Sequence, residues 1–182
     1  MRIITREEVE PLEAHPEFRW YYGEESEKPW IFEASEQYVA FNFEDNSPRR
    51  KDDLDWLCED LAELFKDFKV AYLTIIEPEL FVAPGVAVVE SIRKGHGENR
   101  PLMEAPVHIF TNGESHLLWG FFFSIVQMSW SFHLYFPDYV AMIGYSLPSD
   151  YYFITWKNPE LYEKAKEILK DFYPEFPAKS AE

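Results

Sequence analysis

The alternation of apolar and polar positions is most informative between residues 107 and 156, within a region from Pro101 to Trp156 that contains no Lys or Arg. Aromatic and aliphatic side chains recur there too densely for a protein surface, yet polar residues interrupt them. We interpret the stretch as a strand, a buried helix and then two or three strands. Together these elements are expected to form the core of the domain.

Apolar positions at steps of three and four predict a helix over about 115–129. The residues on this apolar face are Leu117, Leu118, Phe121, Phe122, Ile125 and Met128, and those on the opposite face are His116, Gly120, Ser124 and Gln127. Asn112 or Ser115 is a candidate N-cap, and Gly120 could admit another element at close range. A strand is the alternative, since Phe and Ile also favour pleated surfaces.

A membrane span is a competing interpretation, because residues 115–137 carry no formal charge. Three histidine or glutamine side chains and four serines interrupt this run, and Pro137 ends it. No Lys or Arg flanks it closely, as would be usual at a headgroup layer. We therefore expect a buried core element of a soluble domain, with no membrane association.

A second amphipathic pattern predicts a helix over about 52–68, with Asp52 or Asp53 as its N-cap. Its apolar side consists of Leu54, Leu57, Leu61, Leu64, Phe65 and Phe68, and its other positions are rich in acidic residues. Cys58 falls beside the apolar side and is interpreted as a small core residue.

Capping signals predict two further helices. Thr5 and Glu8 have the spacing of a capping box, which predicts a helix over about 5–14 that ends near Pro16. Asn158 followed by Pro159 predicts the start of a helix over about 159–173. Residues 178–182 are expected to be a frayed tail.

Strand signals complete the expected architecture. Residues 30–33 and 37–43 are predicted to form a hairpin, residues 70–76 a strand, and residues 86–89 a possible strand. Residues 93–101 are predicted to be an exposed loop with a basic bias. The expected fold is a single α+β domain over residues 1–182, with a mostly antiparallel sheet flanked by three to four helices.

Charge narrows the function classes more than any motif does. The chain has 17 basic and 33 acidic residues, which gives a net charge of −16. Such a field repels phosphate backbones and argues against nucleic-acid binding, whereas it attracts basic proteins. The alternative is that the acidity only keeps an aromatic-rich protein in solution. One cysteine and the lack of a signal-like first segment lead us to expect a reducing cytoplasm.

Candidate catalytic and metal-binding residues are few. His108, His116 and His133, with Asp138, could form a zinc site only if the fold happens to bring them together. Cys58 as a nucleophile would need exposure and a lowered pKa, and residues 95–97 lack the context of a phosphate-binding loop. We therefore expect no cofactor, no metal and no enzymatic activity.

Two acidic clusters are the remaining functional signal, and both are candidates for binding a basic partner. The first is a predicted loop with neighbouring aromatic residues, namely Trp20, Tyr22, Glu24, Glu25 and Glu27. The second surrounds the predicted helix at 52–68, namely Asp52, Asp53, Asp55, Glu59 and Glu63. Aromatic anchors beside charges that speed encounter are typical of protein interfaces. A solvated helix face and a hairpin tip are the alternative.

A small, acidic, aromatic-rich α+β chain without a catalytic motif resembles the immunity proteins that bacteria make against their own polymorphic or contact-dependent toxins. The resemblance is one of overall profile across the whole chain. It implies a cytoplasmic inhibitor that covers the active site of a cognate toxin, often a basic nuclease. The alternative function is a small enzyme or ligand-binding domain with a pocket in the aromatic core around His116 and Gln127, to which His108 or His133 could contribute.

Overall fold

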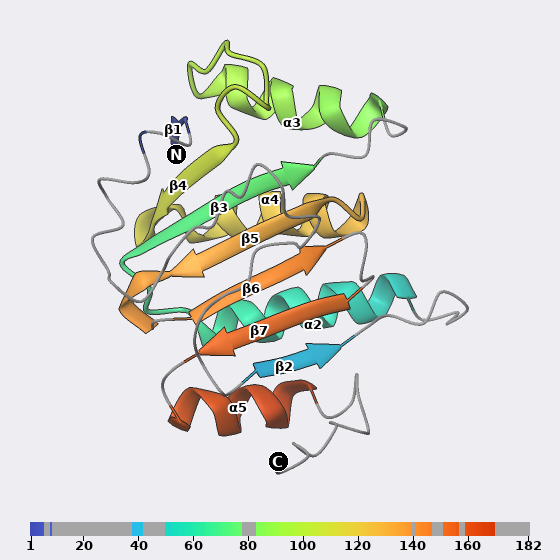
Figure 1. The fold of residues 1–182 in the computed structure, drawn as a ribbon, viewed down its shortest axis with the longest axis vertical. Helices are drawn as coiled ribbons and strands as arrows, with labels where there is room; N and C mark the ends of the chain where they lie inside the picture. The colour runs from blue at the N-terminus through green and yellow to red at the C-terminus, as the bar shows by residue number, and fades with distance from the viewer. Residues whose placement is uncertain are drawn as a thin grey trace, which may run out of the picture.

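The computed structural model describes residues 1–5, 8, 38–41, 50–77, 83–139, 141–146, 151–156 and 159–169. Seven strands form one antiparallel sheet in the order β1-β4-β3-β5-β6-β7-β2 (Figure 1). The strands are β1 (Arg2–Ile4), β2 (Tyr38–Phe41), β3 (Val70–Glu77), β4 (Val107–Thr111), β5 (Ser131–Phe136), β6 (Ala141–Ser146) and β7 (Tyr151–Trp156).

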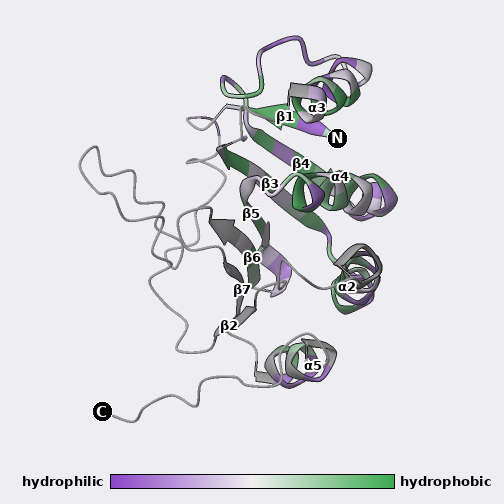
Figure 2. Cartoon of the chain, turned by 90° about the vertical axis from the view of Figure 1, so that its right-hand side faces the viewer, coloured by the Kyte–Doolittle hydropathy of each residue, from purple (hydrophilic) through white to green (hydrophobic). Residues whose placement is uncertain are grey.

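All four described helices lie in one layer on one face of this sheet (Figure 2). They are α2 (Arg50–Leu64), α3 (Ala83–Gly95), α4 (Ser115–Gln127) and α5 (Pro159–Leu169). Along the layer the order is α3, α4, α2 and α5, so that α2 lies between α4 and α5. The predicted α+β class, with an antiparallel sheet flanked by helices, is confirmed.

Strand register decides which side chains face the helices. Leu73 in β3 pairs with His108 in β4 and with Leu134 in β5, so these three share one face of the sheet. Alternation along each strand gives that face a buried apolar set: Ala71, Leu73, Ile75, Phe110, Phe132, Leu134, Phe136, Ala141 and Ile143. The opposite face holds a smaller buried cluster of Ile4, Val107 and Ile109, together with buried polar residues that include Thr74 and His133.

An aromatic cluster joins the sheet to α2 and α4. The ring of Phe136 stacks on Phe65 at 4.2 Å between centroids, with an interplanar angle of 4°. It also contacts Phe68 edge-on at 5.6 Å and stacks on Trp119 at 6.1 Å. These rings come from β5, α4 and the turn that follows α2, and they fill the space between the sheet and the helices. Their burial accounts for the lack of Lys and Arg in the central stretch.

The predicted central helix is confirmed as α4, whose apolar side is buried while His116, Gly120 and Gln127 are exposed. Two details differ from expectation. A short 3₁₀ turn precedes α4 and begins with a capping box between Thr111 and Glu114. The N-cap residue of α4 is Glu114, so neither Asn112 nor Ser115 caps the helix. Among the described residues, no atom of another element lies within 4 Å of a Cβ placed on Gly120, so this glycine does not serve a close approach there.

The expected strand at 86–89 is wrong, since these residues belong to α3. Pro84 lies in the first turn, where the missing N–H costs nothing, and the chain can continue as a helix. Val89 and Arg93 are four residues apart and both buried, which makes them one inward stripe. Arg93 is therefore not part of an exposed basic loop, as the sequence had suggested.

The remaining boundaries agree in part. α2 ends at Leu64, and a turn rather than a further helical turn carries Phe65 and Phe68 into the core. The capping box is present, with Thr5 N–H donating to Glu8 at 2.7 Å and Glu8 N–H to Thr5 Oγ1 at 3.4 Å. α5 begins at Pro159 as predicted.

Several predictions lie outside the described residues: the rest of the helix at 5–14, the strand at 30–33, the end of the last helix and the tail at 178–182. β2 falls within the predicted strand at 37–43, and the partner that the structure shows for it is β7. Among the described helices, none has the length and apolar character needed to cross a membrane.

Candidate functional site

The outer side of α2 carries a row of exposed carboxylates. Leu57, Leu61 and Phe65 are fully buried at steps of four residues, and they fix which side of this segment faces the sheet. Asp55, Glu59 and Glu63 also repeat every four residues, and all three are exposed. We call these three residues the α2 carboxylate row; because one helical turn separates its members, they form a single stripe along the helix.

An exposed tryptophan accompanies this row. Trp56 directly follows Asp55 and precedes Glu59 by three residues, which places the indole beside the stripe. Its side chain is 63% exposed, the largest value among the large hydrophobic side chains that the structure describes. Two residues further on, Cys58 is buried, and desolvation together with the nearby Asp55 charge raises the pKa of its thiol to about 12. Trp56 therefore faces away from the side of the helix that carries the thiol into the core.

Helix α5, the neighbour of α2 in the layer, carries a second acidic row. α5 contacts α2, and its Leu161 and Ala165 are buried, which turns its other side outward. Its exposed acidic residues are Glu160, Glu163 and Glu167. We call the α2 carboxylate row, Trp56 and these three glutamates the acidic helical face. Two exposed lysines lie nearby, Lys66 in the turn that follows α2 and Lys164 on α5, and Lys66 bonds Glu63 at 2.6 Å.

The candidate partner-binding residues have different outcomes. Trp20, Tyr22, Glu24, Glu25 and Glu27 lie outside the described part of the chain. Asp52 and Asp53 lie in the first turn of α2, but their side chains are not described. Asp55, Glu59 and Glu63 are exposed on one side of the helix, as a partner surface requires.

Sequence reasoning missed Trp56 and the glutamates of α5. The signal for Trp56 was present, since the helical period that buries Leu57 and Leu61 leaves position 56 among the acidic positions. The signal for α5 was its own period, which separates Leu161 and Ala165 from Glu160, Glu163 and Glu167. That α5 lies beside α2 could not be read from either pattern.

The structure does not bring the three candidate histidines together. His116 is exposed on the outer side of α4. His108 faces the helices, in ring contact with Phe121 at 4.8 Å, whereas His133 lies on the opposite face of the sheet. Burial lowers the pKa of both His108 and His133 to about 3, and the Arg93 charge adds to the effect on His108. Both imidazoles are therefore neutral at pH 7.

His108 is part of a polar clamp that closes the connection between α3 and β4. Its Nδ1–H donates to the Leu73 carbonyl at 3.3 Å, and its Nε2 accepts from Arg93 Nη1 at 3.2 Å. Arg93 also donates to the carbonyls of Ala105 at 2.7 Å, Arg100 at 3.1 Å and Pro101 at 3.3 Å. Both ring nitrogens of His108 are thus occupied by structural partners.

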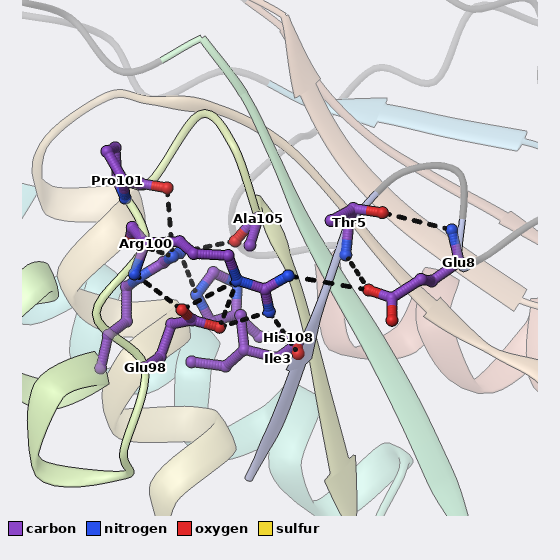
Figure 3. Close-up of polar contacts among 9 residues, drawn as sticks. Ile3, Thr5, Glu8, Glu98, Arg100, Pro101, Ala105 and His108 are labelled. Carbon is purple, nitrogen blue, oxygen red and sulfur yellow. Dashed lines mark hydrogen bonds and ion pairs between the residues drawn. The ribbon is translucent and has the colours of Figure 1, made fainter.

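A second arginine ties the same connection to the first strand (Figure 3). Arg100 binds Glu98 with its closest contact at 2.6 Å and donates to the Ile3 carbonyl of β1 at 3.3 Å. It also lies 3.9 Å from Glu8. The hydrogen bonds from Arg100 lower the pKa of Glu98 to about 2. Glu98 and Arg100 therefore act as structural groups that hold this connection against β1.

Among the described residues, no three His, Cys, Asp or Glu side chains are placed to hold a metal ion. His116 and Gln127, the polar groups of the expected core pocket, are both at the surface. The acidic helical face is therefore the feature that best fits a functional role, and a face of this kind can bind cations or basic protein surfaces.

Comparison of the chain with protein-family models, with curated proteins and with solved structures gives no match.

Proposed function

We propose that this chain is a non-enzymatic, cytoplasmic binding protein that neutralises a basic partner protein, in the manner of an immunity protein acting on a cognate toxin domain. The observation that carries the proposal is the α2 carboxylate row beside the exposed Trp56. The second acidic row on α5 extends the same surface, and the net charge of −16 surrounds it with a field of the same sign.

The physical basis is electrostatic attraction combined with a surface that stays preformed. Charge complementarity between partners speeds diffusional encounter and rejects partners of like charge. The α2 carboxylate row is held on a helix whose other side is locked into the core by Leu57, Leu61 and Phe65. Binding would therefore cost little backbone ordering, which favours affinity.

The alternative of an aromatic-core pocket around His116 has no comparable support. It required His116 and Gln127 to point into the domain, and the structure places both on the outer side of α4. His108, a second candidate polar group for such a pocket, has both ring nitrogens bound within the fold. We therefore develop the binding proposal alone.

The test is growth rescue by co-expression. An upstream neighbouring gene that encodes a basic, growth-inhibiting protein is the partner to express, and the chain should restore growth and co-purify with it. The double variant Asp55→Asn, Glu59→Gln should weaken the rescue. Glu90→Gln with Glu104→Gln makes the same charge change on α3 and its following loop, and it should leave the rescue intact. A metabolic gene neighbourhood, or rescue that both double variants impair equally, would contradict the proposal.

A further inference from the structure

In the part of the chain that the structure describes, core packing gives no reason for an indole at position 56. The inward side of α2 is complete without it, because Leu57, Leu61 and Phe65 are 0–1% exposed. The two other tryptophans whose side chains the structure describes, Trp119 and Trp130, are 8% and 0% exposed. Holding a large aromatic surface in water is unfavourable, so an exposed indole on a helix with a fixed inward side is well suited to contact a second molecule.

The surroundings of Trp56 restrict the chemistry of that contact. Glu59 and Asp60 follow Trp56 by three and four residues on the helix, which are the spacings that bring side chains together. A phosphate backbone or an anionic lipid surface would bring negative charge against these groups. A surface rich in Lys and Arg would be attracted to them, and an arginine could also stack on the indole.

We infer that Trp56 is the anchor of a docking surface for a basic protein, and that the partner presents an apolar notch bordered by Lys or Arg. This inference rests on the proposed function and identifies Trp56 as the residue that contributes most to binding. The carboxylates of Asp55 and Glu59 raise the association rate and make it sensitive to salt. The indole enters the notch and controls the dissociation rate, as aromatic hot spots surrounded by polar contacts do.

The inference can be tested on the full chain with three synthetic peptide probes. The first is an amphipathic helical peptide of Lys and Leu, the second replaces its Leu by Ser, and the third replaces its Lys by Glu. Titrations followed by NMR should show the Lys/Leu peptide shifting the Trp56 indole and the backbone amides of α2. The Lys/Ser peptide should bind more weakly, and the Glu/Leu peptide should not bind.

Variants separate the role of the indole from that of the charges. Trp56→Ala should weaken the Lys/Leu peptide by about 30-fold, in the range of an interface hot spot, mostly through faster dissociation. Trp56→Phe should recover part of the loss. Asp55→Asn with Glu59→Gln should slow association and reduce its salt dependence. Val88→Ala removes apolar surface from a side chain of similar exposure on α3, and it should have no effect.

The outcomes distinguish this inference from the proposed function. If the chain still rescues growth and binds the basic partner while Trp56→Ala changes neither result, the docking surface lies elsewhere and only the inference fails. If the Glu/Leu peptide binds as well as the Lys/Leu peptide, the face is merely apolar and the inference is overturned. Sedimentation of the chain alone tests whether a second copy of the chain occupies the face. Self-association that Trp56→Ala abolishes would assign the face to that second copy and overturn the inference.

Discussion

Replacement of Arg93 by Met tests whether the polar clamp between α3 and β4 stabilises the fold. Met approximates the stem of Arg but removes the donors, so the carbonyl of Ala105 and Nε2 of His108 lose their partner in a buried setting. Hydrogen bonds from a charged group contribute about 1.5–3 kcal/mol each. The weaker bonds to Arg100 and Pro101 are part-buried and add about 1 kcal/mol in total.

Relief of a desolvated charge offsets part of this loss. Burial lowers the pKa of Arg93, which shows that its charged form is disfavoured at this site. Subtracting a few kcal/mol for that desolvation leaves a net loss of about 3 kcal/mol in the free energy of unfolding. For a chain of this size the loss corresponds to a fall in Tm of roughly 6–12 °C.

Urea denaturation followed by circular dichroism measures the change directly, with the m-value expected to stay constant. Lys94→Met is the matched control, because Lys94 is adjacent but exposed, with a 3.9 Å contact to Glu90, and should change stability by less than about 0.5 kcal/mol. In Arg93→Met, the pKa of His108 should also rise from about 3, since a neighbouring positive charge is lost. A stability change below about 1 kcal/mol, or a gain, would refute the reasoning.

Three further predictions concern the fold. The free energy of unfolding should fall as the pH drops below about 6.5, because His108 and His133 bind protons at that pH in the unfolded chain but only near pH 3 in the folded one. The loss should be up to about 1.4 kcal/mol per pH unit for each ring, and a flat profile between about pH 6.5 and 5 contradicts this. Phe136→Ala should cost about 3–5 kcal/mol in urea denaturation, because its ring is fully buried among Phe65 and its neighbours; a cost near 1 kcal/mol would show that the cavity collapses. Ser129→Gly should raise the free energy of unfolding by about 0.5–1 kcal/mol, and with it Tm, because Ser129 has a φ of 53°, which strains a residue with a side chain; an unchanged Tm would contradict this.

Local periodicity was enough to predict most of the elements. The steps of three and four in 115–129 compete with a strand interpretation, and the structure decides for the helix α4 because its apolar stripe matches the aromatic face of β5 and β4. The helix α3 was missed for a physical reason. Its Val-rich composition favours a strand locally, whereas packing of Val86, Val89, Ile92 and Arg93 against the rest of the fold stabilises the helix.

Neighbourhood in space was beyond the reach of local patterns. Local patterns do not place β2 beside β7, because the two strands are separated by more of the chain than most neighbours in the sheet. The same limit applies to the site. Each acidic row could be found from the period of its own helix, but their union depends on α2 and α5 being adjacent in the layer.

Departures from the apolar-inside pattern are informative because each one requires a compensating interaction. Arg93 is a charged residue on the buried side of α3, and the departure is resolved within the chain by four hydrogen bonds to groups that need donors. Trp56 is the reverse case, an aromatic residue on the polar side of α2. Trp56 remains 63% exposed, so most of its surface is in contact with water and not with other side chains of the fold. Selection for stability alone would favour a polar residue there, and binding of a second molecule is the interaction that would instead favour an indole.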